Sequence, residues 1–238
     1  MEIKKGNLEY AANDNITSLV PEDAFDVQKK SLKRLDKFLK RSIDIIASIF
    51  GVILLLPLTI GIYIANLICK DKGPVFYTQN RIGQNGKIFK MYKYRSMVVG
   101  ADDILEKYLE ENEEARKEYK EYKKLKDDPR VTKVGKFIRK TSIDEFPQFI
   151  NVLKGDMSLV GPRPYLEKEK EDMNGYYKYI VTCKPGLTGL WQISGRSDCT
   201  FDERIDLDME YYNNHNLKSD IKILFKTAMK IIKKEGAI

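Results

Sequence analysis

The amino-acid sequence predicts an α+β protein that is predominantly helical and dips into one leaflet of a membrane. Three observations indicate this class. An apolar stretch, residues 43–69, contains Pro57 and has basic residues on both flanks. Two short strand-like runs, residues 75–77 and 88–92, are separated by a glycine-containing turn. Later segments, such as residues 102–126, have compositions or spacings typical of helices.

The proline predicts that the apolar helix enters the bilayer and returns. Its two arms, residues 42–56 and 58–69, measure about 22 Å and about 18 Å at the helical rise, and neither spans a hydrocarbon core of about 30 Å. Because proline lacks an N–H group and clashes with the preceding turn, we expect the helix to break at Pro57. Positive charge accumulates on the cytoplasmic side of membranes, so the two basic flanks place both ends there. A single ordinary spanning helix is the alternative.

Composition limits the function classes. The formal charge of +7 and the isoelectric point of about 9.0 favour anionic partners. Three cysteines without a CxxC pair argue against a disulfide framework. The single histidine, His215, argues against histidine-based zinc sites and Ser–His–Asp triads. The 238 residues suffice for one domain with a small appendage.

Three regions are expected along the chain. Residues 1–28 form a mobile polar leader, and residues 29–72 form an interfacial helix followed by the re-entrant membrane helix. Residues 73–238 form a domain that ends in an amphipathic helix. In this last helix, which Ser219 or Asp220 can cap, apolar residues gather on one side and lysines on the other. Packing on the core and contact with a membrane surface both remain open for it.

Two further segments predict helices. Residues 102–126 are dense in glutamate and lysine, which is typical of one solvated helix with ion pairs four residues apart. Residues 202–212 predict an acidic helix.

Two adjacent carboxylates, Asp144 and Glu145, follow the cations Arg139 and Lys140. Ser142 and Glu145 fit a capping box, so an ordinary helix start is one interpretation. Helix N-termini also bind phosphates, and the cations would keep Asp144 ionised. An ionised aspartate can bind Mg²⁺ together with substrate phosphates, with Glu145 sharing the metal. It can also attack phosphorus and form an acyl phosphate.

Arg163 lies between two prolines, which would fix it to clamp phosphate oxygens, although such a loop can also be a rigid surface turn. Trp191, Gln192 and Arg196 lie in a glycine-punctuated loop. They are candidates for contacts with a sugar or nucleotide, and a core position for Trp191 fits equally well.

In this order, the motifs resemble those of the monotopic phosphoglycosyl transferases, also called bacterial sugar transferases. The resemblance covers most of residues 40–238. The last two motifs are similar to those of larger members that act as undecaprenyl-phosphate galactose or glucose phosphotransferases. The matching segments are residues 40–41, 73–76, 79–83, 92–97, 128–132, 139–145, 153–164, 185–192 and 194–196.

The resemblance implies a re-entrant helix and interfacial amphipathic helices around a small catalytic domain at the cytoplasmic face of the bacterial inner membrane. It implies that Asp144 attacks the β-phosphate of a UDP-sugar, releases UMP and holds the sugar phosphate covalently. Polyprenol (undecaprenyl) phosphate then accepts it, in the first membrane step of exopolysaccharide, capsule, O-antigen or glycoconjugate assembly. Galactose, glucose and N-acetylated sugars all fit this scheme.

Roles for further residues follow from the same resemblance. Glu145 would assist through Mg²⁺ or proton handling, Arg139 and Arg163 match phosphate-binding positions, and Lys93 and Arg95 match a basic motif near the site. Larger relatives imply a homodimer. They also carry several membrane helices ahead of this domain, whereas this chain has only a polar leader and is expected to be the catalytic module alone. Many relatives have Ser-Pro at the helix break, where this chain has Leu-Pro.

Two other functions remain as alternatives. A membrane-bound, Mg²⁺-dependent UDP-sugar phosphohydrolase would use the same carboxylates, with water as the acceptor. A nucleic-acid-binding module would explain the positive charge, but acidic residues interleave with the basic ones and no known nucleic-acid-binding motif is present. We therefore expect no nucleic acid among the partners.

Overall fold

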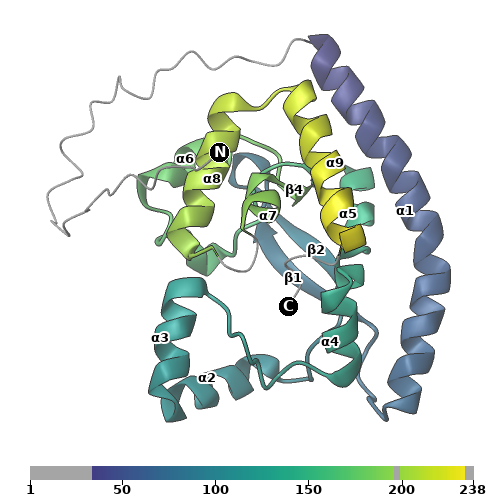
Figure 1. Cartoon of the computed structure of the whole chain (residues 1–238), viewed down its shortest axis with the longest axis vertical. Helices are drawn as coiled ribbons and strands as arrows, with labels where there is room; N and C mark the ends of the chain where they lie inside the picture. Colours follow the sequence, from purple (N-terminus) through teal and green to yellow (C-terminus); the bar gives the residue numbers. More distant parts are fainter. Residues whose placement is uncertain (1–33, 196–198, 234–238) are drawn as a thin grey trace, which may run out of the picture. The chain divides into compact units, whose positions relative to one another are not determined.

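A computed structural model describes residues 34–195 and 199–233. The expected leader, residues 1–28, and Arg196 lie outside the described residues. The described part is mostly helical, with two two-stranded sheets, which confirms the α+β class (Figure 1). The helices are α1 (Arg34–Ile68), α2 (Ala101–Glu111), α3 (Glu113–Tyr122), α4 (Lys133–Lys140), α5 (Gln148–Lys154), α6 (Tyr177–Ile180), α7 (Leu190–Ser194), α8 (Phe201–Asn214) and α9 (Leu217–Lys233). The strands are β1 (Phe76–Ile82), β2 (Ile88–Tyr94), β3 (Ser158–Val160) and β4 (Gly186–Thr188).

Strands β1 and β2 form the hairpin that the two strand-like runs predict. They pair antiparallel from Phe76 opposite Tyr94 to Ile82 opposite Ile88, so both strands are longer than the apolar runs indicate. The turn between them contains Asn85 at φ 57° and Gly86 at φ 77°, which only a few residue types adopt readily. Strands β3 and β4 pair in parallel.

Helix α1 continues through Pro57, which corrects the expectation of two arms separated by a break. Figure 1 shows it as one bent helix. Proline removes a single backbone donor, and the hydrogen bonds on either side hold the helix together. The Tyr94 hydroxyl contacts the helix at this point, 3.2 Å from the Leu55 carbonyl oxygen and 2.8 Å from the Thr59 hydroxyl. Residues 34–41 belong to the same helix, so within the described chain no separate interfacial helix precedes it.

By length and composition, α1 is able to cross a membrane. Only 22% of its most apolar 18-residue window is buried in the protein, so it is not a core helix of the domain. Large apolar side chains such as Ile53, Leu56 and Ile68 are exposed along it. Contiguous apolar exposure on this scale is typical of a membrane-associated helix.

The expected helix over residues 102–126 is two helices, α2 and α3, because Asn112 adopts an extended conformation between them. The turn allows Leu105 and Ala115 to pack together with Leu125 in a small cluster of their own. A straight helix with so few apolar residues would leave these side chains in water, and their burial favours the turn.

Both helices near the C-terminus form as predicted, with different caps. Helix α8 starts after Thr200, whose hydroxyl accepts a hydrogen bond from the Glu203 amide. Helix α9 is capped by Asn216, whose side chain accepts a hydrogen bond from the Ser219 amide, rather than by Ser219 or Asp220. Helix α9 packs on the core through Ile223 and leaves Phe225 exposed, so it has one buried and one exposed apolar side.

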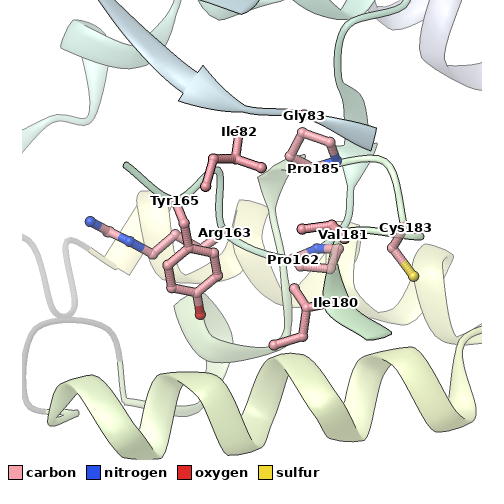
Figure 2. Close-up of a pocket in the computed structure, with 9 residues that line it drawn as sticks. All are labelled: Ile82, Gly83, Pro162, Arg163, Tyr165, Ile180, Val181, Cys183 and Pro185. Atoms are coloured by element: carbon pink, nitrogen blue, oxygen red, sulfur yellow. The ribbon is translucent and has the colours of Figure 1, made fainter. Parts of the chain in front are cut away.

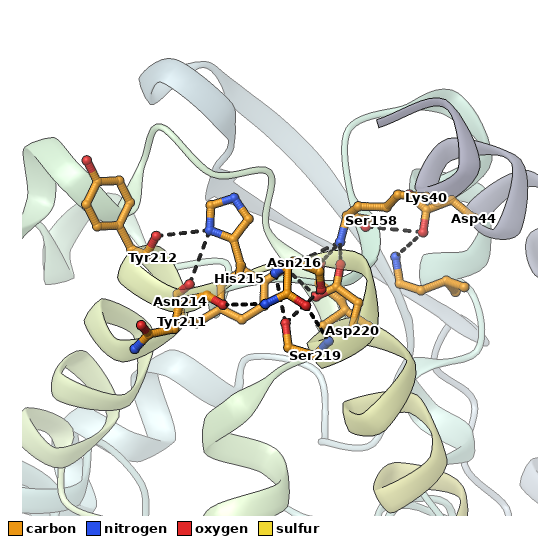
Figure 3. A network of polar contacts seen from close by, with 12 residues as sticks. Lys40, Asp44, Ser158, Tyr211, Tyr212, Asn214, His215, Asn216, Ser219 and Asp220 are labelled. Atoms are coloured by element: carbon orange, nitrogen blue, oxygen red, sulfur yellow. Dashed lines mark hydrogen bonds and ion pairs between the residues drawn. The ribbon is translucent and has the colours of Figure 1, made fainter. Parts of the chain in front are cut away.

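Buried polar contacts attach α1 to the domain (Figure 3). Lys40 forms an ion pair with Asp220 of α9 and donates to the Val160 carbonyl oxygen at 2.9 Å. Asp44, 4% exposed, accepts hydrogen bonds from the Ser158 hydroxyl at 3.1 Å and the Leu159 amide at 2.9 Å. Because buried charges are stable only when they are paired, these contacts fix α1 against β3 and α9.

We predict that Asp44→Ala lowers the free energy of unfolding by about 1.5–3 kcal/mol, because it removes a charged acceptor of two hydrogen bonds. Denaturant unfolding in detergent, followed by tryptophan fluorescence, measures the change. Asp36→Ala is the matched control on the same helix and should have little effect. Equal stability of the two variants would contradict the role of Asp44.

Candidate active site

The two adjacent carboxylates lie in a 3-10 turn, Ile143–Glu145, between α4 and α5. Ser142 has φ 57° and its side chain makes no capping hydrogen bond, so the expected capping box is not formed. The left-handed residue reverses the chain after α4, which separates the carboxylates from the start of α5. Non-glycine residues in this conformation are strained by about 1 kcal/mol or more and are frequent at functional sites.

Asp144 is half-buried, and its surroundings change its acidity. Burial raises the pKa of Asp144 to about 6; the Lys93 and Arg139 cations lower it, and the Glu145 carboxylate raises it. The side chain is therefore mostly ionised at neutral pH, yet less well solvated than a surface carboxylate. A carboxylate with a shifted pKa among cations is a typical feature of a catalytic site.

Lys93 and Glu145 come together across 52 residues of sequence. The Lys93 ammonium on β2 lies 3.0 Å from a Glu145 carboxylate oxygen. Arg139 is in the last turn of α4, where its Nε donates to the Ser96 hydroxyl at 2.9 Å. Burial lowers the pKa of Arg139, and Asp144 opposes this. The structure thus brings four of the predicted residues together: Asp144, Glu145, Lys93 and Arg139.

Arg95 has a different environment from the one we expected. Its three guanidinium nitrogens donate to the Pro74 carbonyl oxygen at 2.6 Å, the Met97 carbonyl oxygen at 2.8 Å and the Asp71 carboxylate at 2.8 Å. It is 6% exposed and ties the end of α1 to the end of β2. These contacts occupy all three guanidinium nitrogens with protein acceptors.

Arg163 follows β3 and lies beside Trp191 of α7. Its guanidinium carbon is 5.7 Å from the centre of the Trp191 ring, and its Nη2 is 3.6 Å from the Glu169 carboxylate. A second arginine, Arg204 of α8, lies 5.6 Å from the same ring. Trp191 lies in α7 and is only partly buried, so it is not a core residue. Its ring contacts the guanidinium groups of Arg163 and Arg204. Gln192 is the next residue in α7 and is partly buried.

Sequence reasoning did not single out Arg204 or Arg81. Arg204 is the one basic residue in the acidic segment 202–212, and this isolated position in the sequence could have marked it as a candidate site residue. Arg81 is the next-to-last residue of β1, and only the tertiary fold places its side chain 3.9 Å from the Glu169 carboxylate.

The small cavity next to Arg163 is not a substrate site. It has a volume of about 10 Å³, enough for no more than one water molecule, and is lined by apolar residues such as Ile82 and Ile180 (Figure 2). Figure 2 shows the Arg163 side chain extending away from it. An open groove of about 410 Å³ between the start of α1 and the start of α9 contains none of the predicted site residues.

The carboxylate pair fits a magnesium ion that is held jointly with a substrate. Within residues 34–195 and 199–233, no group of three or more His, Cys, Asp or Glu side chains could hold a metal alone. Mg²⁺ commonly uses one or two protein carboxylates plus substrate phosphates, and Asp144 and Glu145 supply two. The Lys93 ammonium contacts one oxygen of Glu145.

Comparison with known proteins identifies the family. A sequence profile described as bacterial sugar transferase matches residues 35–234. The chain belongs to the bacterial sugar transferase family. It is 47% identical over 211 residues to an undecaprenyl-phosphate galactose phosphotransferase of Salmonella typhimurium, covering 89% of this chain and 44% of the relative. It is 50% identical over 199 residues to the galactosyl transferase CpsE of Streptococcus agalactiae, covering 83% and 43%.

A shorter family member is covered more fully. The chain is 42% identical over 198 residues to the exopolysaccharide production protein ExoY of Rhizobium meliloti, covering 83% of this chain and 87% of the relative. This bacterial sugar transferase chain thus spans under half the length of the two longer relatives and most of the length of ExoY.

Within the transferase fold, Asp208 of α8 fixes the loop that carries Arg163. Its Oδ2 accepts hydrogen bonds from the Arg163 amide at 3.0 Å and the Tyr165 hydroxyl at 2.8 Å. Burial raises the pKa of Asp208 from its ordinary value of 3.8 to about 7, although both hydrogen bonds act in the opposite direction.

We predict that Asp208 makes the protein less stable as the pH rises from about 4 to about 7. In this window the folded protein holds a proton that the unfolded chain has lost, so the free energy of unfolding falls by up to about 1.4 kcal/mol per pH unit. Asp208→Asn keeps the acceptor oxygen and removes the titration. Denaturant unfolding across this range should give a flatter pH dependence for the variant than for the parent, and parallel curves would refute the assignment.

Proposed function

We propose that this chain is a phosphoglycosyl transferase that moves a sugar 1-phosphate from a UDP-sugar to undecaprenyl phosphate. The observation that carries the proposal is the Asp144–Glu145 pair, held among the cations Lys93 and Arg139. The site turn also packs against the apolar helix: Ile143 and Phe146 contact the cluster that contains Leu55. A reaction between a soluble nucleotide and a lipid phosphate needs such a site beside the bilayer. The name of an Escherichia coli relative that is 38% identical over 209 residues, UDP-glucose:undecaprenyl-phosphate glucose-1-phosphate transferase, supports these two substrates.

The chemistry proceeds in two displacements. A carboxylate oxygen of Asp144 attacks the β-phosphorus, the bond from this phosphorus to the bridging oxygen breaks, and UMP leaves with the electron pair. A phosphate oxygen of the lipid acceptor then attacks the same phosphorus, and the Asp144 carboxylate leaves. Lys93, Arg139 and Arg163 neutralise phosphate charge in both steps. Mg²⁺ held by Asp144 and Glu145 would supply further neutralisation of that charge.

The location follows from the same proposal. The site lies at the cytoplasmic face of the bacterial inner membrane, with α1 in the membrane, and the product feeds exopolysaccharide, capsule or related assembly. The names of the ExoY relatives support an exopolysaccharide pathway. The homodimer stays a prediction that cross-linking in membranes can test.

We predict that Asp144→Asn abolishes turnover, because the amide cannot form the acyl phosphate. UMP release from a panel of UDP-sugars, with and without polyprenol phosphate and Mg²⁺, measures turnover and identifies the sugar. Asp103→Asn, an exposed acid on α2, is the control and should retain activity. Mass spectrometry of the trapped parent should show a phosphosugar on Asp144.

Three outcomes would contradict this scheme. Full activity of Asp144→Asn would remove the nucleophile. A trapped reaction with no adduct on that residue would remove the covalent step. UMP release without a lipid product, even when polyprenol phosphate is present, would indicate the phosphohydrolase instead.

We predict that Lys93→Met moves the acid limb of the pH–rate profile upward by roughly one unit, because a nearby cation lowers the pKa of the Asp144 carboxylate. The measurement is kcat/KM between pH 5 and pH 8. Lys90→Met, an exposed lysine on the same strand, should leave the limb in place. A lower rate with an unmoved limb would indicate a binding role for Lys93 alone.

A further inference from the structure

A single tyrosine side chain joins α1 to strand β2. The Tyr94 ring is 1% exposed and stacks on Phe76 of β1, with the ring centres 5.3 Å apart. Its hydroxyl lies 3.2 Å from the Leu55 carbonyl oxygen and 2.8 Å from the Thr59 hydroxyl. These two contacts lie on either side of Pro57 in the sequence of α1. The three residues Leu55, Thr59 and Tyr94 are called the proline bridge below.

The hydrogen bonds of the proline bridge have one consistent direction. A phenol hydroxyl carries a single proton, and Tyr94 donates it to the Leu55 carbonyl oxygen. The Tyr94 oxygen can then only accept, so the Thr59 hydroxyl is the donor in the second contact. The two hydroxyl groups therefore form one chain that ends on the backbone of α1. Removal of the Tyr94 hydroxyl breaks both hydrogen bonds of this chain.

The place of this hydroxyl has a physical reason in the proline. Proline has no N–H group and its ring clashes with the preceding turn, which disturbs the hydrogen bonds of the carbonyl oxygens there. Leu55 belongs to that turn, and the apolar surroundings of α1 make an unpaired carbonyl oxygen costly. Tyr94 supplies a donor to this oxygen from another element. A phenylalanine would fill the same core space, so packing alone does not account for the hydroxyl.

The residues next to Tyr94 connect the proline bridge with the candidate active site. Lys93 precedes Tyr94 on β2, and its ammonium lies 3.0 Å from a Glu145 carboxylate oxygen. Arg95 follows Tyr94 and donates at 2.8 Å to Asp71, which comes after α1. Strand β2 is therefore attached at two points, to α1 and to the segment that follows it, directly beyond Lys93. A shift of Tyr94 relative to α1 would move the backbone that carries Lys93.

The proline bridge also belongs to the core beneath the carboxylate pair. Leu55, Tyr94 and Ile138 lie in one buried cluster, which combines α1, β2 and α4. Ile143 and Phe146, on either side of the carboxylate pair, pack against the same cluster. The helix, the strand with the lysine and the turn with the carboxylates thus share one core. A contact that fixes two of these elements also limits the movement of the third.

We propose that Tyr94 is a positioning residue, whose hydroxyl connects the two sides of Pro57 and thereby holds β2 where Lys93 meets Glu145. This inference rests on the proposed function, in which Lys93 neutralises phosphate charge. Tyr94 acts through Lys93 and takes no part in forming or breaking bonds. The position of the apolar helix in this way determines the position of a cation in the site, although the two are in different elements.

Unfolding measurements on the full chain in detergent test the proline bridge without any turnover. Tyr94→Phe removes the hydroxyl and keeps the ring, so the denaturant midpoint should fall. Thr59→Val should lower the midpoint of the parent and have little effect in Tyr94→Phe, because the Thr59 hydroxyl has then already lost its partner. Tyr92→Phe is the matched control on the same strand. It removes a hydroxyl that contacts the exposed Lys154 and should shift the midpoint little.

Kinetic measurements test the positioning role, at a temperature at which every variant is folded. Tyr94→Phe should lower kcat for UMP release in the presence of polyprenol phosphate about tenfold, with KM for the UDP-sugar nearly unchanged, because a displaced cation mainly affects the transition state. In Lys93→Met, the same substitution should cause no further loss of kcat. Losses at residues that act independently would instead multiply. Tyr92→Phe should keep the kcat of the parent.

The outcomes separate this proposal from the proposed function. An unchanged midpoint in Tyr94→Phe would refute the proline bridge. An unchanged kcat in Tyr94→Phe, or a loss that multiplies with that of Lys93→Met, would refute the positioning role even when the lipid product forms. If the parent forms no lipid product while the midpoints shift as expected, the proline bridge is supported and the transferase is refuted.

Discussion

Charged side chains of helix α1 form buried contacts with β3 and α9, and these contacts attach the helix to the rest of the protein. The position of the candidate active site depends on this attachment. Lys40 with Asp220, and Asp44 with the start of β3, are satisfied only in one placement of the helix. Apolar contacts alone would allow the helix to slide or rotate, because they are not directional. Paired buried charges prevent sliding and rotation of the helix, because either movement would leave a buried charge without its partner.

With the helix fixed, the turn that carries Asp144 packs beside it through Ile143 and Phe146. The same turn faces β2, which supplies Lys93. One carboxylate is thereby held between an apolar surface and a group of cations. Burial and positive charge act on the pKa of this carboxylate in opposite directions, and the result is an ionised but poorly solvated carboxylate. The proposed reaction requires such a position, because it brings a lipid phosphate and a soluble nucleotide to the same carboxylate.

Positive charge in this protein has two distinct uses. Arg95 and Lys40 are consumed by internal contacts and hold elements together. The arginines near Trp191 are incompletely paired among the described residues, and the proposed reaction uses Arg163 of this group to neutralise phosphate charge. The formal charge of the chain does not separate these uses, because it counts both alike.

The sequence by itself determined the main helical segments and the hairpin, because these follow from local spacing. It also identified the carboxylate pair and Arg163 as candidate site residues, because these lie in contiguous motifs. The tertiary structure decided that α1 continues through Pro57, and that Asn112 divides the acidic and basic segment into two helices. It also decided which basic residues face the carboxylates: Lys93 does and Arg95 does not, although they are two residues apart on one hairpin. The physical reason is that the role of a side chain depends on its neighbours in space. The neighbours of Lys93 and Arg204 come from other segments of the chain, and no local sequence pattern predicts these contacts.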